Sequence, residues 1–469
     1  MVYMNSYPPL EKRVLPSPPR WTKAVGVGVV VMGLAMGTGE LILWPHLVTK
    51  FGLGLLWLAF LGITFQYFIN QEVARHSLAT GEGFFTTSAR ALKWLAPFWL
   101  VSGVLLYIWP GWASAIGTTL RELVGFGTHE VWAWVALALV LVLTYSGKVA
   151  YRMLETSLKI TVPTFFVLLV VISFFNLSAG DISLMWEGLT NFGGIPEGID
   201  LNTLLGAIVF SGAGGMLNLC VSLWYRDKQL GMSRYVGRIT NPITGKKEAV
   251  SPQGYTFDTE DPENRARWKG WMRYVRIDQG IIFWLLGFVT LLLLSVNAYA
   301  VLTPQGLVPE GLDVAVVQAH IFGEHWGAAG FNLFLVMAFL MLFSVMWTVI
   351  DALTRIISDV LHTNSHVGPF TRYLEWCKDI SLGKLYYIII TAIVIIGAVL
   401  VPLEQPLTLL VISAVLGGLT MAVYSPLLIY FNNTRLPKFI RPHWITNVIM
   451  VFISLFFMYF AVRIILSYL

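Results

Sequence analysis

The chain has 469 residues, of which 56% are hydrophobic and 12% are charged, and its mean hydropathy is +0.70. A soluble domain has about 25% charged residues, so this composition excludes a large soluble domain and indicates a protein that uses lipid as its solvent. The net charge of +5 does not indicate a nucleic-acid partner, because the basic residues lie in loops between apolar segments. Two cysteines, Cys220 and Cys377, cannot form a disulfide framework, because one lies in an apolar span and the other in a basic loop.

Residues 1–23 form a polar, proline-rich segment with no short apolar core before a small-residue cleavage site. We therefore predict a cytoplasmic tail and no signal peptide. A membrane-spanning helix needs roughly 17–25 mainly apolar residues, and by this criterion the sequence predicts an all-α integral membrane protein with about eleven spans. The predicted spans are 24–48, 53–73, 94–118, 130–147, 158–178, 202–224, 277–303, 328–357, 385–402, 407–431 and 444–467.

The loop charges give these spans a direction. Of the 31 lysines and arginines, all but Lys50, Arg121 and Arg463 fall in the N-terminal tail or in connections on one side of the spans. Because basic residues gather on the cytoplasmic side of a membrane, we predict a cytoplasmic N-terminus and an external C-terminus. In a prokaryote the membrane would be the plasma (inner) membrane.

The connection at 226–275 is the one long polar segment between the predicted spans. The run Arg267-Trp268-Lys269-Gly270-Trp271 within it is typical of side chains at the lipid headgroup layer. A regulatory or partner-binding role for this loop is the alternative. The spans around it form two blocks of five, at 24–178 and 202–431, followed by an eleventh helix at 444–467.

Two of the apolar spans are interrupted by glycine at their midpoints. The first span contains Met36-Gly37-Thr38-Gly39-Glu40, and the sixth contains Ser211-Gly212-Ala213-Gly214-Gly215. Unwound backbone at membrane depth persists only where it is buried in protein or lines a cavity. These spans are the first helices of the two blocks, and because five is odd the second block runs inverted. Interrupted helices at matching places in inverted halves indicate the central site of a transporter.

Glu40 is the acidic side chain at this predicted site. An unpaired carboxylate near the bilayer centre costs at least ~2.5–3.5 kcal/mol, and close packing of small residues does not offset that cost. We therefore predict a functional role for Glu40, the alternative being a protonated side chain that caps a half-helix. The candidate ligands are rich in oxygen, which favours a hard cation or a proton over a soft transition metal. They are Thr38, Glu40, Ser211, Asn218 and Ser413.

The stretch from Gly33 to Gly81 resembles the first two helices of the Nramp family of divalent-metal transporters. Phe51-Gly52-Leu53-Gly54-Leu55-Leu56-Trp57 and Ala79-Thr80-Gly81 match the family's pattern without a gap. Three shorter stretches are also similar, and with them the resemblance covers nearly the whole chain: Tyr151-Arg152-Met153-Leu154-Glu155, Ile277-Asp278 and Ser425-Pro426-Leu427-Leu428. The resemblance implies a LeuT-like 5+5 inverted repeat, alternating access and a substrate site between helices 1, 6 and 10.

The chain departs from this family at the metal ligands. The family's helix-1 motif Asp-Pro-Gly-Asn is matched by Gly37-Thr38-Gly39-Glu40, and its helix-6 motif Met-Pro-His by Gly215-Met216-Leu217. A glutamine of helix 10 falls on Ser413, and the acidic residues of helix 3 fall on Trp112 and Thr119. The resemblance therefore does not carry over the family's metal selectivity or proton route, although the shift of charge to Glu40 leaves room for an altered cation site.

Asp351, Arg355 and Asp359 lie at i, i+4 and i+8 on one face of the eighth span. This spacing predicts an ion-pair ladder that anchors or gates the cytoplasmic end, with a direct part in proton movement as the alternative. The sequence has no P-loop, GxSxG, HExxH or CxxC motif, so we predict neither an enzyme nor an ATP-driven pump.

The sequence as a whole predicts a secondary active transporter that moves a small cation, with a divalent metal as the first candidate, past Glu40. The site residues are Gly37, Thr38, Gly39, Glu40, Ser211, Gly212, Gly214, Gly215, Asn218 and Ser413, with Glu40 as the candidate metal ligand. A transporter of a small polar organic or anionic solute on the same fold is the alternative, followed by a non-transporting receptor or scaffold. We expect no cofactor; the partners are the lipid bilayer and the small ion or solute that is transported, and a divalent cation, a coupling proton or both are the candidate ions.

Overall fold

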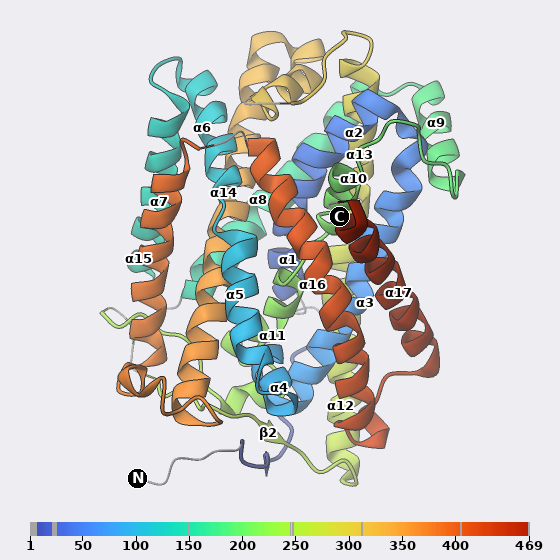
Figure 1. Cartoon of the computed structure of the whole chain (residues 1–469). Coiled ribbons are helices and arrows are strands. Elements are labelled where there is room, and N and C mark those ends of the chain that lie inside the picture. The colour runs from blue at the N-terminus through green and yellow to red at the C-terminus, as the bar shows by residue number, and fades with distance from the viewer. Residues whose placement is uncertain are drawn as a thin grey trace.

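The computed structural model describes residues 7–20, 26–147, 150–243, 245, 248–310, 313–403 and 406–467. These residues form a bundle of long helices with one small pair of strands (Figure 1). The α-helices of the first half are α1 (Val27–Ala35), α2 (Trp44–Phe51), α3 (Leu56–Thr80), α4 (Phe84–Ala91), α5 (Leu95–Tyr107), α6 (Gly111–Val124), α7 (His129–Ser146), α8 (Ala150–Asn176) and α9 (Ala179–Thr190). Those of the second half are α10 (Leu201–Val209), α11 (Leu217–Asp227), α12 (Pro262–Val275), α13 (Leu286–Leu302), α14 (His320–His366), α15 (Leu382–Leu400), α16 (Pro406–Thr434) and α17 (Trp444–Ser467).

Short 3-10 and π-helical segments join or extend these helices. The 3-10 turns are η3 (Leu53–Leu55), η4 (Gly231–Tyr235), η7 (Val317–Ala319), η8 (Glu375–Cys377) and η9 (Lys438–Ile440). Two π-helical segments, η2 (Met36–Leu43) and η5 (Arg276–Leu285), lie inside spanning helices. π-Helical turns inside α-helices are rare, and those that occur are often found at functional sites. The segment η2 therefore marks the first span as a candidate part of a functional site.

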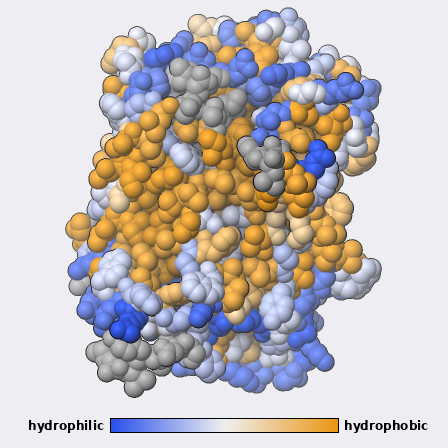
Figure 2. Space-filling model, viewed as in Figure 1, coloured by the Kyte–Doolittle hydropathy of each residue, from blue (hydrophilic) through white to orange (hydrophobic). Residues whose placement is uncertain are grey.

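Ten helical stretches of the described residues are long and apolar enough to cross a membrane. The predicted span at 202–224 is not one of them, because it is divided into the short helices α10 and α11. The prediction of about eleven spans therefore corresponds to these ten helical stretches and one broken helix. Their outer faces form an apolar belt between two polar ends (Figure 2), and side chains such as Phe174 are largely exposed there. Such a belt is the surface that a bilayer covers.

The prediction of an unwound first helix is wrong in its form. α1, η2 and α2 follow one another without a gap, and the Trp44 amide donates to the Gly39 carbonyl in the i→i+5 pattern of a π-helix. A π-helix keeps its backbone groups hydrogen-bonded, as membrane depth requires. The start of α1 is held by Asp278, whose carboxylate accepts from the amides of Gly26 at 3.1 Å and Gly28 at 2.9 Å. A carboxylate at this place satisfies the unpaired amides of a helix N-terminus.

One end of the bundle, called here the N-terminal face, holds residues 7–20, α4 and the strands. β1 (Glu11–Lys12) pairs in parallel with β2 (Tyr255–Thr256), at the lower end of Figure 1. The prediction that 226–275 is wholly a polar loop is wrong at its end, because α12 is helical and continues into the seventh span. The tryptophans of this helix pack inside the protein and not against lipid: Trp268 is 4% and Trp271 is 2% exposed. Trp271 donates to the Pro16 carbonyl at 2.8 Å, so the N-terminal segment covers the helix.

Candidate functional site

The helix-6 break lies between α10 and α11, where the sequence predicts it. Residues 210–216 turn without forming a regular helix, and Gly214 and Gly215 have φ values of +77° and +52°. Only glycine adopts this left-handed region without cost. A Cβ added to Gly215 would also lie 2.9 Å from the Cα of Gly417 on α16, so the chain needs glycine here for close packing as well.

Gln66 of α3 bridges the two sides of the break. Its side-chain amide donates to the Val209 carbonyl at 2.7 Å, and its carbonyl oxygen accepts from the Gly214 amide at 2.8 Å. A Cβ added to Gly212 would lie 2.5 Å from the same oxygen, which leaves no room for a side chain there. Gln66 therefore takes over backbone hydrogen bonds that the helix loses at this point.

Two tyrosine hydroxyls complete this replacement. Tyr107 donates to the Gly214 carbonyl and accepts from the Leu217 amide, both at 3.1 Å. Tyr424 of α16 donates to the Gly215 carbonyl at 2.9 Å and accepts from the Asn218 side chain at 3.1 Å. Gln66 and both tyrosines were not predicted from the sequence. The available signal was weak: each is a polar side chain within an otherwise apolar span.

Replacing Gln66 with leucine is expected to destabilise the protein and to reduce transport. The variant keeps the side-chain volume but leaves the Val209 carbonyl and the Gly214 amide buried without partners, at about 1–3 kcal/mol each. The measurement is thermal unfolding in detergent, with Gln71→Leu on the same helix as the control, because among the described residues Gln71 hydrogen-bonds only to the side chains of Tyr67 and Glu72. Equal unfolding temperatures for the two variants would contradict the role of Gln66.

The glycines of the first helix contact different neighbours. A Cβ added to Gly39 would lie 1.8 Å from the Phe210 carbonyl oxygen, so helices 1 and 6 touch through their backbones there. A Cβ added to Gly37 would lie 2.3 Å from Val345 of α14, away from the break. The side chain of Thr38 lies outside the described residues.

The structure brings the predicted oxygen ligands together only in part. Ser211 lies at the break, donates to the Ala207 carbonyl at 2.8 Å and accepts from the Trp44 indole at 2.9 Å. Asn218 lies in the first turn of α11, and its side-chain oxygen is buried without a hydrogen-bond partner among the described residues. Ser413 instead donates to the Leu106 carbonyl at 2.6 Å. Gly417 and Tyr424 are the residues of α16 described above that contact the break.

Glu40 is fully buried, and neither of its carboxylate oxygens has a hydrogen-bond partner among the described residues. The side chain packs toward the seventh span, since a Cβ added to Gly287 would lie 3.7 Å from its Oε1 atom. The Thr290 hydroxyl is near enough to interact with the carboxylate but donates to the Gly287 carbonyl at 2.8 Å. Glu40 is thus an unpaired carboxylate beside the contact of helices 1 and 6.

The described residues contain no group of three or more His, Cys, Asp or Glu side chains that could hold a metal ion. A cation at Glu40 would therefore be bound by one carboxylate together with neutral oxygens. Hard cations such as Mg²⁺ accept such ligands and keep part of their water shell, whereas soft metals need sulfur or imidazole.

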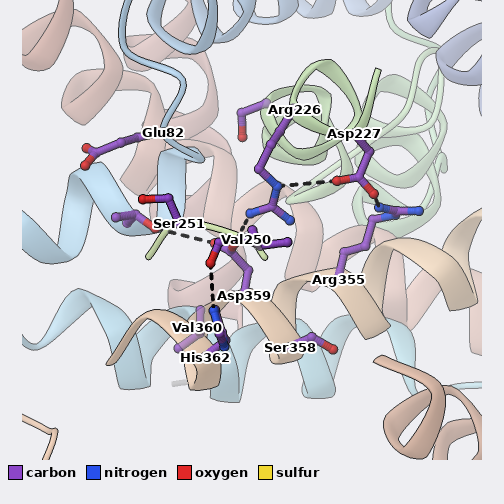
Figure 3. Close-up of polar contacts among 12 residues, drawn as sticks. Glu82, Arg226, Asp227, Val250, Ser251, Arg355, Ser358, Asp359, Val360 and His362 are labelled. Atoms are coloured by element: carbon purple, nitrogen blue, oxygen red, sulfur yellow. Dashed lines mark hydrogen bonds and ion pairs between the residues drawn. The ribbon is translucent and has the colours of Figure 1, made fainter. Parts of the chain in front are cut away.

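A buried charge network joins α11 and α14 (Figure 3). Arg355 pairs with Asp351 at 2.6 Å and with Asp227 of α11. The predicted ladder is wrong at its last step, because Asp359 pairs with Arg226 and not with Arg355. Arg226 also lies 3.4 Å from Asp227, so two helices share one network. From the sequence, Arg226 was predicted to lie in the loop after the sixth span, and its pair with Asp359 was therefore not predicted.

The polypeptide covers this network from the N-terminal face. The Val250 carbonyl lies 3.4 Å from His362, and the Gly254 amide donates to Glu82 at 3.3 Å. Tyr7 of the N-terminal segment donates to Asn364 at 2.7 Å, and burial raises the pKa of its hydroxyl, so it stays a donor. Between these segments a cavity of only about 10 Å³ remains.

The opposite side of the site is closed as well. Gln318 donates to the Leu41 carbonyl, and His46 lies 2.8 Å from the Pro309 carbonyl. The side chains at the centre, Glu40, Ser211 and Asn218, are each 0% exposed. Among the described residues these central side chains are therefore closed to solvent.

An interrupted helix 6 packed on an irregular helix 1, within two repeats of membrane-spanning helices, defines the LeuT-like class of transporter fold. No protein-family model and no curated protein matches the chain. Among solved structures, the chain is similar to a manganese transporter of Eremococcus coleocola, with a TM-score of 0.64 and 14% identity over 96% of this chain and 90% of that chain. It is also similar to MhsT in complex with L-phenylalanine, with a TM-score of 0.53 and 14% identity over 94% and 98% of the two chains.

A third similar structure is Mhp1, a nucleobase-cation-symport-1 family transporter, with a TM-score of 0.50 and 15% identity over 95% of this chain and 86% of that chain. These likenesses confirm the predicted fold class. The Eremococcus coleocola protein and Mhp1 are described as transporters. At these identities the comparisons show the fold, and the roles of individual site residues stay predictions.

Proposed function

We propose that the chain is a secondary active transporter of the Nramp-like class that moves a small hard cation, with a divalent metal as the first candidate, by alternating access. The observation that carries the proposal is Glu40, a fully buried carboxylate without a hydrogen-bond partner. An ionised carboxylate is costly in such a place unless a proton or a cation neutralises it. Glu40 is therefore suited to bind and release a neutralising proton or cation during each transport cycle.

The surroundings of Glu40 support movement of that counter-charge. The carboxylate lies on a π-helical segment that touches the helix-6 break through Gly39, so a shift of either helix changes its surroundings. The network of Arg226, Asp227, Arg355 and Asp359 joins α11 to α14 through buried ion pairs, and we propose that it closes one route to the site. We propose that this network opens in the state that faces the N-terminal side. From the distribution of basic residues, that side is the cytoplasm.

Flux measurements in proteoliposomes test this function. Purified protein is expected to take up Mg²⁺, Mn²⁺ or Ca²⁺ into liposomes, faster when an inward proton gradient is imposed and not at all in protein-free liposomes. Amino acids and a nucleobase in the same assay test the organic-solute alternative. Saturable uptake of an organic solute with no uptake of any cation would contradict the proposal and favour that alternative.

A further inference from the structure

A basic cavity lies at the N-terminal face, on the edge of the bundle between α3, η5 and the start of α17. Its volume is about 330 Å³. The polar side chains that line it are Gln71, Arg75, Arg276, Arg441, His443 and Thr446. None of its lining residues is acidic. Three arginines around one concave space make it a candidate site for an anion.

Two of these arginines have donors to spare. Arg75 is held by Glu72 at 2.9 Å and by the Ile440 carbonyl at 3.1 Å, so it belongs to the protein's own framework. Arg276 and Arg441 use their Nε atoms on backbone carbonyls, at 3.3 Å and 2.8 Å. Among the described residues neither of them forms an ion pair. Their terminal guanidinium nitrogens can therefore each donate two parallel hydrogen bonds to a phosphate.

The cavity adjoins the apolar belt that faces lipid. Ile281, about one π-helical turn beyond Arg276, is 48% exposed, and Leu285 after it is 43% exposed. On α17, Phe452 is 54% exposed and packs on Phe65 of α3. Trp444, at the start of α17, is 67% exposed, as is typical of a tryptophan at the membrane interface. A basic cavity at headgroup depth that continues into an apolar surface matches the two parts of a phospholipid.

We propose that this cavity binds the phosphate of an anionic phospholipid, with Arg276 and Arg441 on the phosphate and the acyl chains along Ile281 and Phe452. A free phosphate would satisfy the same arginines but would make no use of the apolar surface. The bound lipid would join the second, seventh and eleventh spans at the N-terminal face. The inference concerns a lipid site and is independent of the transported substrate.

Native mass spectrometry of the delipidated protein with added lipid tests the proposal. Palmitoyl-oleoyl phosphatidylglycerol is expected to bind more tightly than palmitoyl-oleoyl phosphatidylcholine. The variant Arg276→Gln/Arg441→Gln is expected to lose about fivefold in phosphatidylglycerol affinity for each arginine, about 25-fold in all. Among the described residues both side chains hydrogen-bond only to backbone carbonyls, so the variant is expected to fold.

The control is Arg435→Gln/Lys438→Gln, which removes the same amount of positive charge. Both residues are exposed, lie with Arg441 between α16 and α17, and do not line the cavity. This control is expected to bind phosphatidylglycerol as the wild type does. Equal losses in both double variants would overturn the site in favour of general surface attraction. Inorganic phosphate that displaces the lipid at equal concentration would overturn the assignment to a lipid. Thermal unfolding of each variant without added lipid separates loss of binding from loss of fold.

Discussion

Replacing Glu40 with glutamine is expected to abolish cation uptake in proteoliposomes while the protein still folds and inserts. Glutamine keeps the shape of the side chain but cannot carry the negative charge that a cation or proton neutralises. Because the Glu40 carboxylate has no hydrogen-bond partner among the described residues, the substitution breaks no contact of that kind. We therefore expect an unfolding temperature at or above that of the wild type, since an uncompensated buried charge is destabilising.

Two variants sharpen this test. Glu40→Asp keeps the carboxylate but shortens its reach, so we expect partial uptake with a weaker apparent affinity. Glu324→Gln removes a carboxylate outside the central site, in a cavity also lined by His320 and Asn332, and is expected to leave uptake unchanged. Full uptake by the Glu40→Gln variant would remove the carboxylate from the mechanism, whereas loss of uptake with loss of fold would assign Glu40 a structural role.

The spans and the helix-6 break were predictable because they depend on local sequence. Runs of apolar residues determine the spans, and the cluster around Gly214 permits backbone angles that other residues avoid. The form of the first helix was not predictable in this way. Gly37 and Gly39 allow unwinding and close packing alike, and the choice depends on Phe210 and Val345, which lie far along the chain.

The same limit explains the site residues that sequence reasoning missed. Gln66 hydrogen-bonds to Gly214 across 148 positions, so no local pattern marks the pair. Helical spacing predicted a pair between Arg355 and Asp359, but Arg226 lies close enough to Asp359 to take its place. Spacing shows which side chains share a helical face, and tertiary packing decides which partner each one binds.

Replacing Arg355 with methionine is expected to open the N-terminal side of the site and to expose Cys220 to a thiol reagent. The substitution leaves Asp351 and Asp227 buried without their shared arginine, and breaking a buried pair from one side costs about 3–5 kcal/mol. Cys220 is a suitable reporter because it is buried on α11 one heptad before Asp227, with its Sγ atom 4.0 Å from the Ala352 carbonyl oxygen.

The measurement is labelling by a membrane-impermeant maleimide applied to the N-terminal face of reconstituted protein. Cys377, the other cysteine, is replaced by serine so that Cys220 alone reports. We expect no labelling in this background and clear labelling after Arg355→Met. The matched control is Arg238→Met, which breaks a partly exposed pair with Glu248 on the same face. Such pairs contribute about 1 kcal/mol or less, so Cys220 should stay protected.

A double variant distinguishes a charge network from simple packing. Arg355→Met/Asp227→Asn removes a positive and a negative charge together, and so leaves one fewer uncompensated carboxylate than Arg355→Met alone. The contacts between Arg355 and Asp227 indicate that their charges are coupled. The loss of unfolding free energy in the double variant is therefore expected to be about 0.5–3 kcal/mol smaller than the sum of the losses in the two single variants. Cys220 should then regain part of its protection. Additive losses with full labelling would mean that the shape of the Arg355 side chain, and not its charge, closes this side of the site.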